Sequence, residues 1–163
     1  KGELEKNRLM GLRWMNSQTR RTPLVLVNKK GAVASLVFEK VEPKVTPSVQ
    51  GGKIVFDVNV SVKGGIITKE QFVTDAQIRK LAQQTIRREI MYTYQQGLNI
   101  KADVYNLLEA AYRKTPDLWE QAAESGEFPL KDDSLRSLRV DVRITNSGKN
   151  TKSLSETNGK RNF

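Results

Sequence analysis

The stretch from residue 75 to 96 constrains the fold most, because its apolar residues repeat at helical spacing and form a single stripe. The stripe consists of Ile78, Leu81, Ala82, Thr85, Ile86, Ile90 and Tyr94. Thr74 and Asp75 come just before it and can accept hydrogen bonds from the free N–H groups of a first helical turn, and Gly97 can end the helix in a left-handed conformation. The pattern predicts an amphipathic helix over 75–96, which needs another element to cover its stripe.

Residues 53–63 supply that cover, because apolar and polar residues alternate along them. One face of the predicted strand carries Ile54, Phe56, Val58, Val60 and Val62. At about 3.3 Å per residue these eleven residues span roughly 36 Å. The helix is about 33 Å long at about 1.5 Å per residue. The matching lengths predict a helix lying flat on a sheet, which is an α+β layer.

Shorter patterns predict the strands that come earlier in the chain. Residues 9–14 alternate weakly, with Leu12 and Trp14 facing inward, and 24–27 and 33–41 are strands joined by a turn at 28–31. Pro43 and Pro47 are expected to fray the far end of the 33–41 strand and to blunt its open edge. Gln50-Gly51-Gly52 is expected to turn the chain into the valine strand, so that residues 24–63 form an antiparallel meander, and Gly64-Gly65 is expected to break that strand.

The second half of the chain is predicted to be mainly helical. A second helix should begin near Ala102–Asp103 and stop before Pro116. A third, short helix should carry Leu118, Trp119, Ala122 and Ala123, and a last strand at 138–144 has one wet, mostly basic face. The sequence thus predicts an α+β fold. Its antiparallel sheet has about four to five strands and is packed on one face by a long helix and two shorter helices, in the order β-β-β-β-α-α-α-β. The domain is expected over 1–147, with a flexible polar tail at 148–163.

Composition and charge narrow the class of protein. The chain has no cysteine and no histidine, which excludes disulfides, thiolate zinc sites and cysteine nucleophiles, and removes the usual metal ligand and general base. The net charge of +10 is concentrated at the two ends, because 74–125 carries as many acidic as basic residues. No run is long enough for a membrane span, and there is no signal peptide. Because it starts at Lys1 without a methionine, the chain reads as a piece of something longer.

No motif in the sequence predicts catalysis, a cofactor or a metal centre. Asp132-Asp133 could ligate a cation, but a surface pair of this kind is more often solvated. Two alternatives stay open. The charge is compatible with a basic nucleic-acid-binding domain, in which Arg20-Arg21 could contact phosphate. Solvation is the simpler interpretation of this pair, because it lacks the interleaved aromatic residues that bind single strands. A hydrolase with an unrecognised carboxylate site is the other.

Several segments follow one another in an order that resembles a known family. They are Leu9–Asn16 with its leucine-X-glycine opening, the meander with Val45, Pro47 and Gly51, the valine strand, the long charged helix, the stretch from Ala102–Asp103 to Tyr112–Trp119, and Val140–Ile144. This order is similar to that of the C-terminal domain of Ger(x)C spore germination lipoproteins, over roughly residues 8–147. After Asp103 the chain departs from the family's small residues, which favours a more regular helix there.

The resemblance implies the C subunit of a nutrient germinant receptor, a non-enzymatic protein needed for nutrient-triggered germination and its signal transduction. Such subunits are lipid-anchored at the outer face of the spore inner membrane and contact integral-membrane A- and B-type subunits. The palmitate-bearing cysteine would lie upstream of this fragment, which is itself expected to be soluble. We expect partner or headgroup contacts at five basic residues: Arg13, Arg20, Arg21, Arg139 and Arg143.

Overall fold

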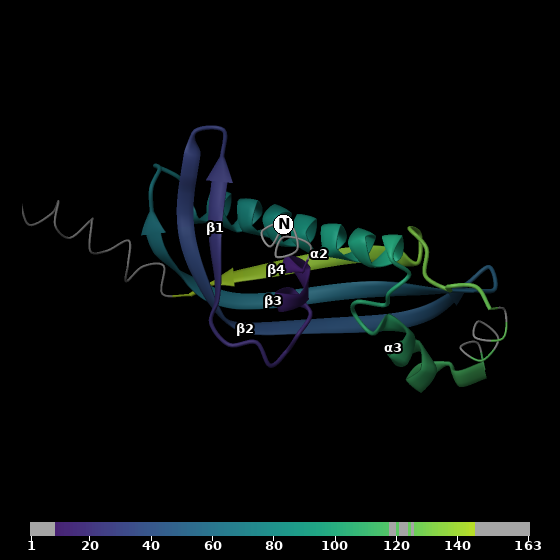
Figure 1. Ribbon diagram of the computed structural model, residues 1–163. Coiled ribbons are helices and arrows are strands. Elements are labelled where there is room, and N and C mark those ends of the chain that lie inside the picture. The colour runs from purple at the N-terminus through teal and green to yellow at the C-terminus, as the bar shows by residue number, and fades with distance from the viewer. Residues whose placement is uncertain (1–8, 118–119, 121–123, 125, 146–163) are drawn as a thin grey trace, which may run out of the picture.

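A computed structural model describes residues 9–117, 120, 124 and 126–145. The elements along the chain are η1 (Met10–Trp14), β1 (Thr22–Asn28), β2 (Gly31–Gln50), β3 (Lys53–Lys69), α2 (Asp75–Asn99), α3 (Leu107–Lys114) and β4 (Leu135–Ile144). They form one four-stranded sheet with helices against it, so the α+β prediction is confirmed (Figure 1). Leu118, Trp119, Ala122 and Ala123, which were predicted to lie on a third short helix, and the tail at 148–163 are outside the described residues.

The sheet has the order β1-β2-β3-β4 and is mixed. The β1–β2 and β2–β3 pairs are antiparallel, but β4 pairs with β3 in parallel, from Phe56 beside Leu135 to Gly64 beside Ile144. The prediction of an all-antiparallel sheet is therefore wrong for the last strand. The reason lies in the connection, because a chain that leaves a strand and crosses back through helices returns to the same end of the sheet and adds a parallel neighbour.

The strands β2 and β3 run on past every residue that was expected to end them. Gly64 pairs with Phe38, and a Cβ added at Gly64 would lie 2.6 Å from the Phe38 Cα. This glycine therefore permits a close backbone approach and does not break the strand. Pro43 and Pro47 also stay within β2, beyond the part that β1 covers, so they lie on an open edge as predicted but do not fray it. Figure 1 shows that the paired strands β2 and β3 bend along their length. The part of the sheet beside β1 therefore stands at a steep angle to the part beside β4.

The helix α2 lies along one face of the sheet, as its apolar stripe predicts (Figure 1). Its stripe residues Ile78, Ala82, Ile86 and Ile90 are at most 1% exposed and share one core with the valines of β3. Its predicted start is confirmed by a capping box, in which Thr74 Oγ1 accepts from Gln77 N–H and Gln77 Oε1 accepts from Thr74 N–H.

The end predicted for α2 is wrong, because Gly97 is helical and the helix continues to Asn99. The glycine is needed for packing, since a Cβ there would lie 2.8 Å from the Ala102 carbonyl oxygen. The helix α3 also begins later than predicted, at Leu107. Asp103 still serves its first turn, because its carboxylate accepts from the N–H groups of Leu107 and Leu108 at 2.9 and 2.8 Å.

In place of the predicted first strand, 9–14, the structure has the 3-10 helix η1. Its buried residues are three positions apart, which matches the three residues per turn of a 3-10 helix and not the alternation of a strand. Gly11 and Trp14 are buried while Leu12 is only half-buried, so the inward direction is confirmed for Trp14. The Gly11 N–H donates to Thr93 Oγ1 at 2.9 Å, and Trp14 Nε1 donates to Glu89 Oε1 at 2.8 Å. The segment η1 is therefore fastened to the middle of α2.

Candidate interaction surface and cavity

A row of three cations crosses the sheet face that points away from α2. Lys40, Lys63 and Arg143 lie side by side on β2, β3 and β4, and all three are exposed. Lys40 pairs with Glu42 at 3.4 Å, but Lys63 and Arg143 form no ion pair with any residue the structure describes. Like charges directly opposite one another on a sheet are destabilising. An anionic group placed over the row would relieve this repulsion.

Two surface hollows extend this row toward the N-terminal loop. One, of about 430 Å³, is lined by Lys40, Lys63 and Arg143 together with the carboxylates of Glu42 and Asp141. The other, of about 570 Å³, is lined by Arg20, Arg21 and Lys40 together with Glu39. The two hollows share Lys40. We call these five cations the basic surface: Arg20, Arg21, Lys40, Lys63 and Arg143. The structure therefore brings together three of the five arginines expected to make partner contacts.

The other two arginines have partners within the domain. The Arg13 guanidinium lies 4.7 Å from the Trp14 ring, bonds both carboxylate oxygens of Glu89, and donates to the Pro23 carbonyl at 2.6 Å. Arg13 thereby helps to hold η1 against α2. Arg139 is exposed and pairs with Asp141 at 3.5 Å, on the same face as the basic surface. Partner contact through any of the five arginines stays a prediction.

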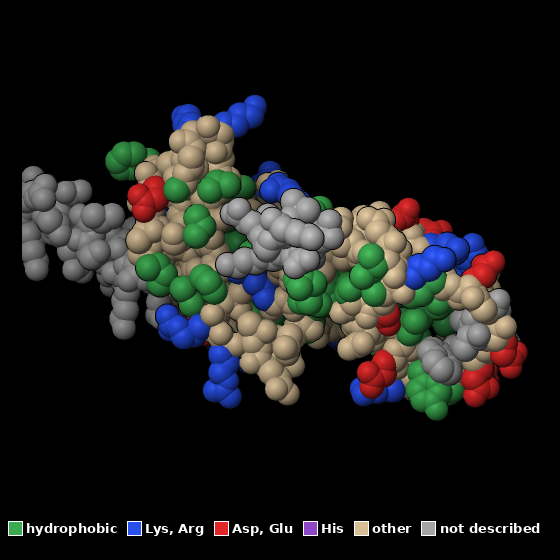
Figure 2. All heavy atoms as spheres, in the orientation of Figure 1, with side chains coloured by type: hydrophobic (Ala, Val, Ile, Leu, Met, Phe, Trp, Pro, Cys, Tyr) green, Lys and Arg blue, Asp and Glu red, His purple; other side chains and the backbone are tan. Residues whose placement is uncertain are grey.

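An exposed apolar patch adjoins the basic surface at the β1 end of the sheet. Val25, Val27 and Ile67 are 50–61% exposed, and Phe72, in the loop after β3, is fully exposed. Figure 2 shows hydrophobic side chains gathered over this end, with Lys and Arg side chains at its margins. We call Val25, Val27, Ile67 and Phe72 the apolar patch. Sequence reasoning missed it, although the unbroken apolar run 24–27 at a sheet edge was a signal.

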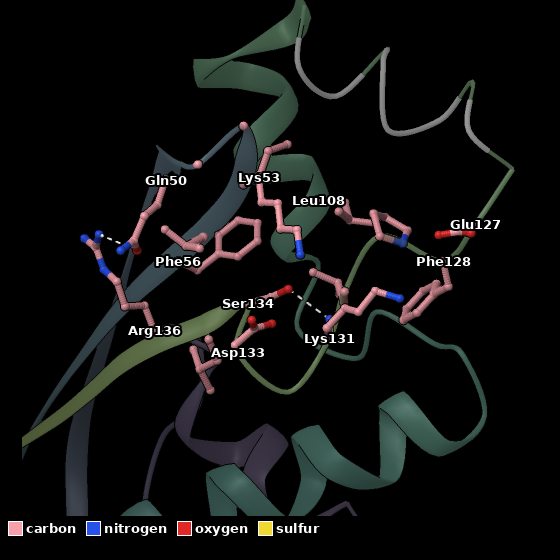
Figure 3. Close-up of a pocket in the computed structure, with 17 residues that line it drawn as sticks. Gln50, Lys53, Phe56, Leu108, Glu127, Phe128, Lys131, Asp133, Ser134 and Arg136 are labelled. Carbon is pink, nitrogen blue, oxygen red and sulfur yellow. Dashed lines mark hydrogen bonds between the residues drawn. The ribbon is translucent and has the colours of Figure 1, made fainter.

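At the opposite end of the sheet the structure holds a cavity of about 770 Å³. Its walls are the β2–β3 hairpin, α3 and the segment 127–136 (Figure 3). Phe56, Leu130 and Leu135 are buried at its floor, and Leu108 and Phe128 are half-buried beside them. The cavity is therefore mainly apolar inside.

The segment that forms one wall of the cavity is fixed by hydrogen bonds. Tyr94 Oη donates to the Lys131 carbonyl at 2.7 Å, the Lys131 N–H donates to Ser134 Oγ at 2.9 Å, and the Phe56 N–H donates to the Ser134 carbonyl at 2.7 Å. Gln95 Nε2 donates to Asp132 Oδ1 at 2.7 Å. Asp132 is thus used to anchor the wall, and the described residues contain no cluster of three or more acidic side chains that could hold a metal ion.

The tyrosine that anchors this wall predicts a loss of stability in alkali. Burial raises the pKa of Tyr94 to about 12, whereas an unfolded tyrosine loses its proton near pH 10. The stability that the protonated phenol contributes is complete below about pH 10 and is lost as the pH rises toward about 12. In urea unfolding at pH 8, 9.5 and 11, Tyr94→Phe should lose less stability with pH than the parent chain. The exposed Tyr92→Phe should follow the parent, and equal pH slopes in all three proteins would contradict the assignment.

Comparison with known proteins identifies a matching family and a crystal structure with a similar fold. Residues 1–148 match the family described as Spore germination B3/GerAC like, C-terminal. The fold is similar to that in a crystal structure of the GerBC protein, with a TM-score of 0.68 and 18% sequence identity over 86% of this chain and 45% of that chain. At this identity the likeness concerns the fold, and the chain spans less than half the length of GerBC. Curated proteins gave no match.

Proposed function

Because the chain belongs to the Spore germination B3/GerAC like, C-terminal family, we propose that it works as a non-enzymatic part of a germinant receptor C subunit. In this role it contacts integral-membrane A- and B-type subunits at the outer face of the spore inner membrane, where an upstream lipid anchor tethers the full-length protein. None of the helices in the described ranges is long and apolar enough to cross a membrane.

The observation that carries this proposal is the basic surface and the apolar patch beside it. Apolar side chains at the centre of an interface contribute affinity once they are covered, and charges around them speed and orient the encounter. Lys63 and Arg143 have no carboxylate partner in the described part of the chain, so an acidic surface on a partner subunit would supply one. The two features lie on one sheet, because β2 and β3 stay paired from Lys40 and Lys63 through Phe38 and Gly64 to Val37 and Gly65, in the direction of the apolar patch.

Charge reversal on this face should abolish its contacts without unfolding the domain. With Lys63→Glu and Arg143→Glu together in the full-length protein, we expect nutrient-triggered germination of spores to slow by at least about tenfold, because like charges would then oppose an acidic partner. Co-purification of the A- and B-type subunits from spore membranes should fall in parallel.

A matched variant controls for the change in net charge. Lys80→Glu and Arg88→Glu reverse two exposed cations on α2, outside the basic surface, and should germinate like the parent. Normal germination and normal co-purification in the Lys63 and Arg143 double variant would refute this contact surface. A complete lack of any nutrient defect in spores without the protein would refute the receptor role itself.

A further inference from the structure

We propose that the sheet face turned away from α2 packs on the same face of a second copy of this chain, related by a two-fold axis at the level of Val60. This inference goes beyond the proposed receptor role, because it concerns contacts between two copies of the chain and not contacts with A- and B-type subunits. Its basis is the order in which positive and negative side chains follow one another along the strands.

Four rows of side chains cross β2, β3 and β4 on this face, and their charges alternate in sign. Successive rows lie two residues apart, which is about 7 Å along a strand. The first and third rows are positive, and the second and fourth are negative. Toward the β2–β3 turn, the rows are Lys40, Lys63 and Arg143; Glu42, Ser61 and Asp141; Lys44, Asn59 and Arg139; and Thr46, Asp57 and Ser137.

A two-fold axis that runs between the second and third rows, parallel to them, places every row opposite a row of the other sign. Rotation about this axis turns the second copy over and reverses its strands, so the second row faces the third and the first faces the fourth. On β2, Glu42 then faces Lys44 of the second copy, and on β4, Asp141 faces Arg139. Each of these contacts occurs twice, as in any interface built from the same surface on both copies.

The contacts at the centre of this arrangement are stronger than those at its ends. Ser61 and Asn59 face each other at the axis, and both are uncharged groups that can hydrogen bond. Further out, Lys63 would face Asp57 of the second copy, but Asp57 already bonds the Arg136 guanidinium through both carboxylate oxygens. The second and third rows therefore carry most of the contact. A second copy would also cover Lys63, so it would compete there with an acidic partner subunit.

The ion pairs already present on this face leave its charges free to take new partners. Lys40 pairs with Glu42 at 3.4 Å and Arg139 with Asp141 at 3.5 Å, and these four side chains are 49–80% exposed. Exposed pairs of this kind contribute little to stability, so their carboxylates can exchange partners or accept a second cation. Lys44 is exposed and forms no ion pair within the described ranges.

The dimensions of the face fit a weak, reversible dimer. Sheets packed face to face lie about 10 Å apart, a gap that a long cation and a carboxylate can close from opposite sides. The four rows extend roughly 20 Å along three strands spaced about 4.8 Å apart, which is at the small end of protein interfaces. The net charge of +10 also opposes association. We therefore expect dimers at high protein concentration only.

Exchanging the charges of the two central rows tests the proposal in the purified chain. Glu42→Lys with Asp141→Lys makes the second row positive, and Lys44→Glu with Arg139→Glu makes the third row negative. Either variant alone should dimerise at least about tenfold more weakly than the parent, because like charges then face each other across the axis. An equimolar mixture of the two variants should form heterodimers, since every changed row again faces its opposite.

Sedimentation velocity with a dye on the second-row variant alone measures the heterodimer. Lys80→Glu with Arg88→Glu is the matched control, because it changes the net charge as the third-row variant does, but on the exposed side of α2. This control should dimerise like the parent and should bind the labelled second-row variant at least about tenfold more weakly than the third-row variant does. Circular dichroism checks that all three variants are folded.

Three results would overturn the proposal. They are a parent dissociation constant above about 1 mM, charge-reversed variants that dimerise like the parent, and a mixture in which the labelled variant stays monomeric. None of these measurements depends on germination, so the receptor role can fail or hold separately.

Discussion

Replacing Gly11 by valine is expected to lower the free energy of unfolding by about 3 kcal/mol or more, the upper range for overpacking. A Cβ at this position would lie 2.6 Å from the Glu89 carbonyl oxygen and 2.8 Å from Thr93 Oγ1. Backbone on α2 cannot move aside as a flexible side chain would. The η1 segment would have to move away from α2 to make room. This movement would break the buried hydrogen bond from the Gly11 N–H to Thr93 and leave a buried donor unsatisfied.

Urea unfolding followed by circular dichroism measures this effect as a shift of the midpoint at constant slope. Gly11→Ala should show a smaller loss in the same direction. Ser17→Ala, at an exposed position in the following loop, should stay within about 0.5 kcal/mol of the parent. A Gly11→Val protein with parental stability would mean that η1 does not pack on α2 in solution.

Truncating Ile86 to alanine is expected to cost about 3 kcal/mol, within the 2–5 kcal/mol typical of buried large-to-small changes. Ile86 is fully buried in the core that α2 shares with the valine face of β3. Alanine has a higher helix propensity than isoleucine, so the loss comes from the cavity and not from the helix itself. The measurement therefore tests the contact between helix and sheet.

Gln84→Ala is the matched control, because Gln84 lies on the exposed side of the same helix. Its stability should change by less than about 0.5 kcal/mol. If Ile86→Ala lowered the free energy of unfolding as little as Gln84→Ala does, α2 would not be covering the sheet, and the α+β layer would be wrong.

The sequence predicts the elements whose signal is periodic and local. The alternation from Ile54 to Val62 predicts the first half of β3, and the stripe from Ile78 to Tyr94 predicts α2 and the face that it buries. Thr74 identifies the helix start because its side chain can bond the first turn. These features depend on neighbours within a few residues, so they can be read without the fold.

The role of each glycine and the direction of the last strand could not be predicted from local patterns. A glycine that frees the backbone and a glycine that makes room for a neighbour look alike in sequence, and Gly64 and Gly97 are of the second kind. The parallel direction of β4 depends on where the helices return the chain. The alternating letters of residues 9–14 hid a helix of one turn, because Gly11 and Trp14 are buried by contacts with residues far along the chain.

The candidate sites were only partly predictable. Arg20, Arg21 and Arg143 were identified by their charge, but Lys40, which joins them, and Lys63 were not. Arg13 has the same charge, and only its contacts with Glu89, Trp14 and the Pro23 carbonyl show that its guanidinium is occupied. The cavity gathers side chains from three separate segments, and no local pattern in the sequence marks it.

The passage of β2 and β3 through both halves of the sheet has a mechanical consequence. The apolar patch lies at one end of this pair of strands and the cavity at the other, and a single core runs between them. The pairing of β2 with β3 shifts register between Ser35 and Leu36 and between Phe38 and Lys40, but it continues on both sides of each shift. We expect a force applied at the apolar patch to be transmitted along β2 and β3 to the cavity end, so that the two ends of the domain move together.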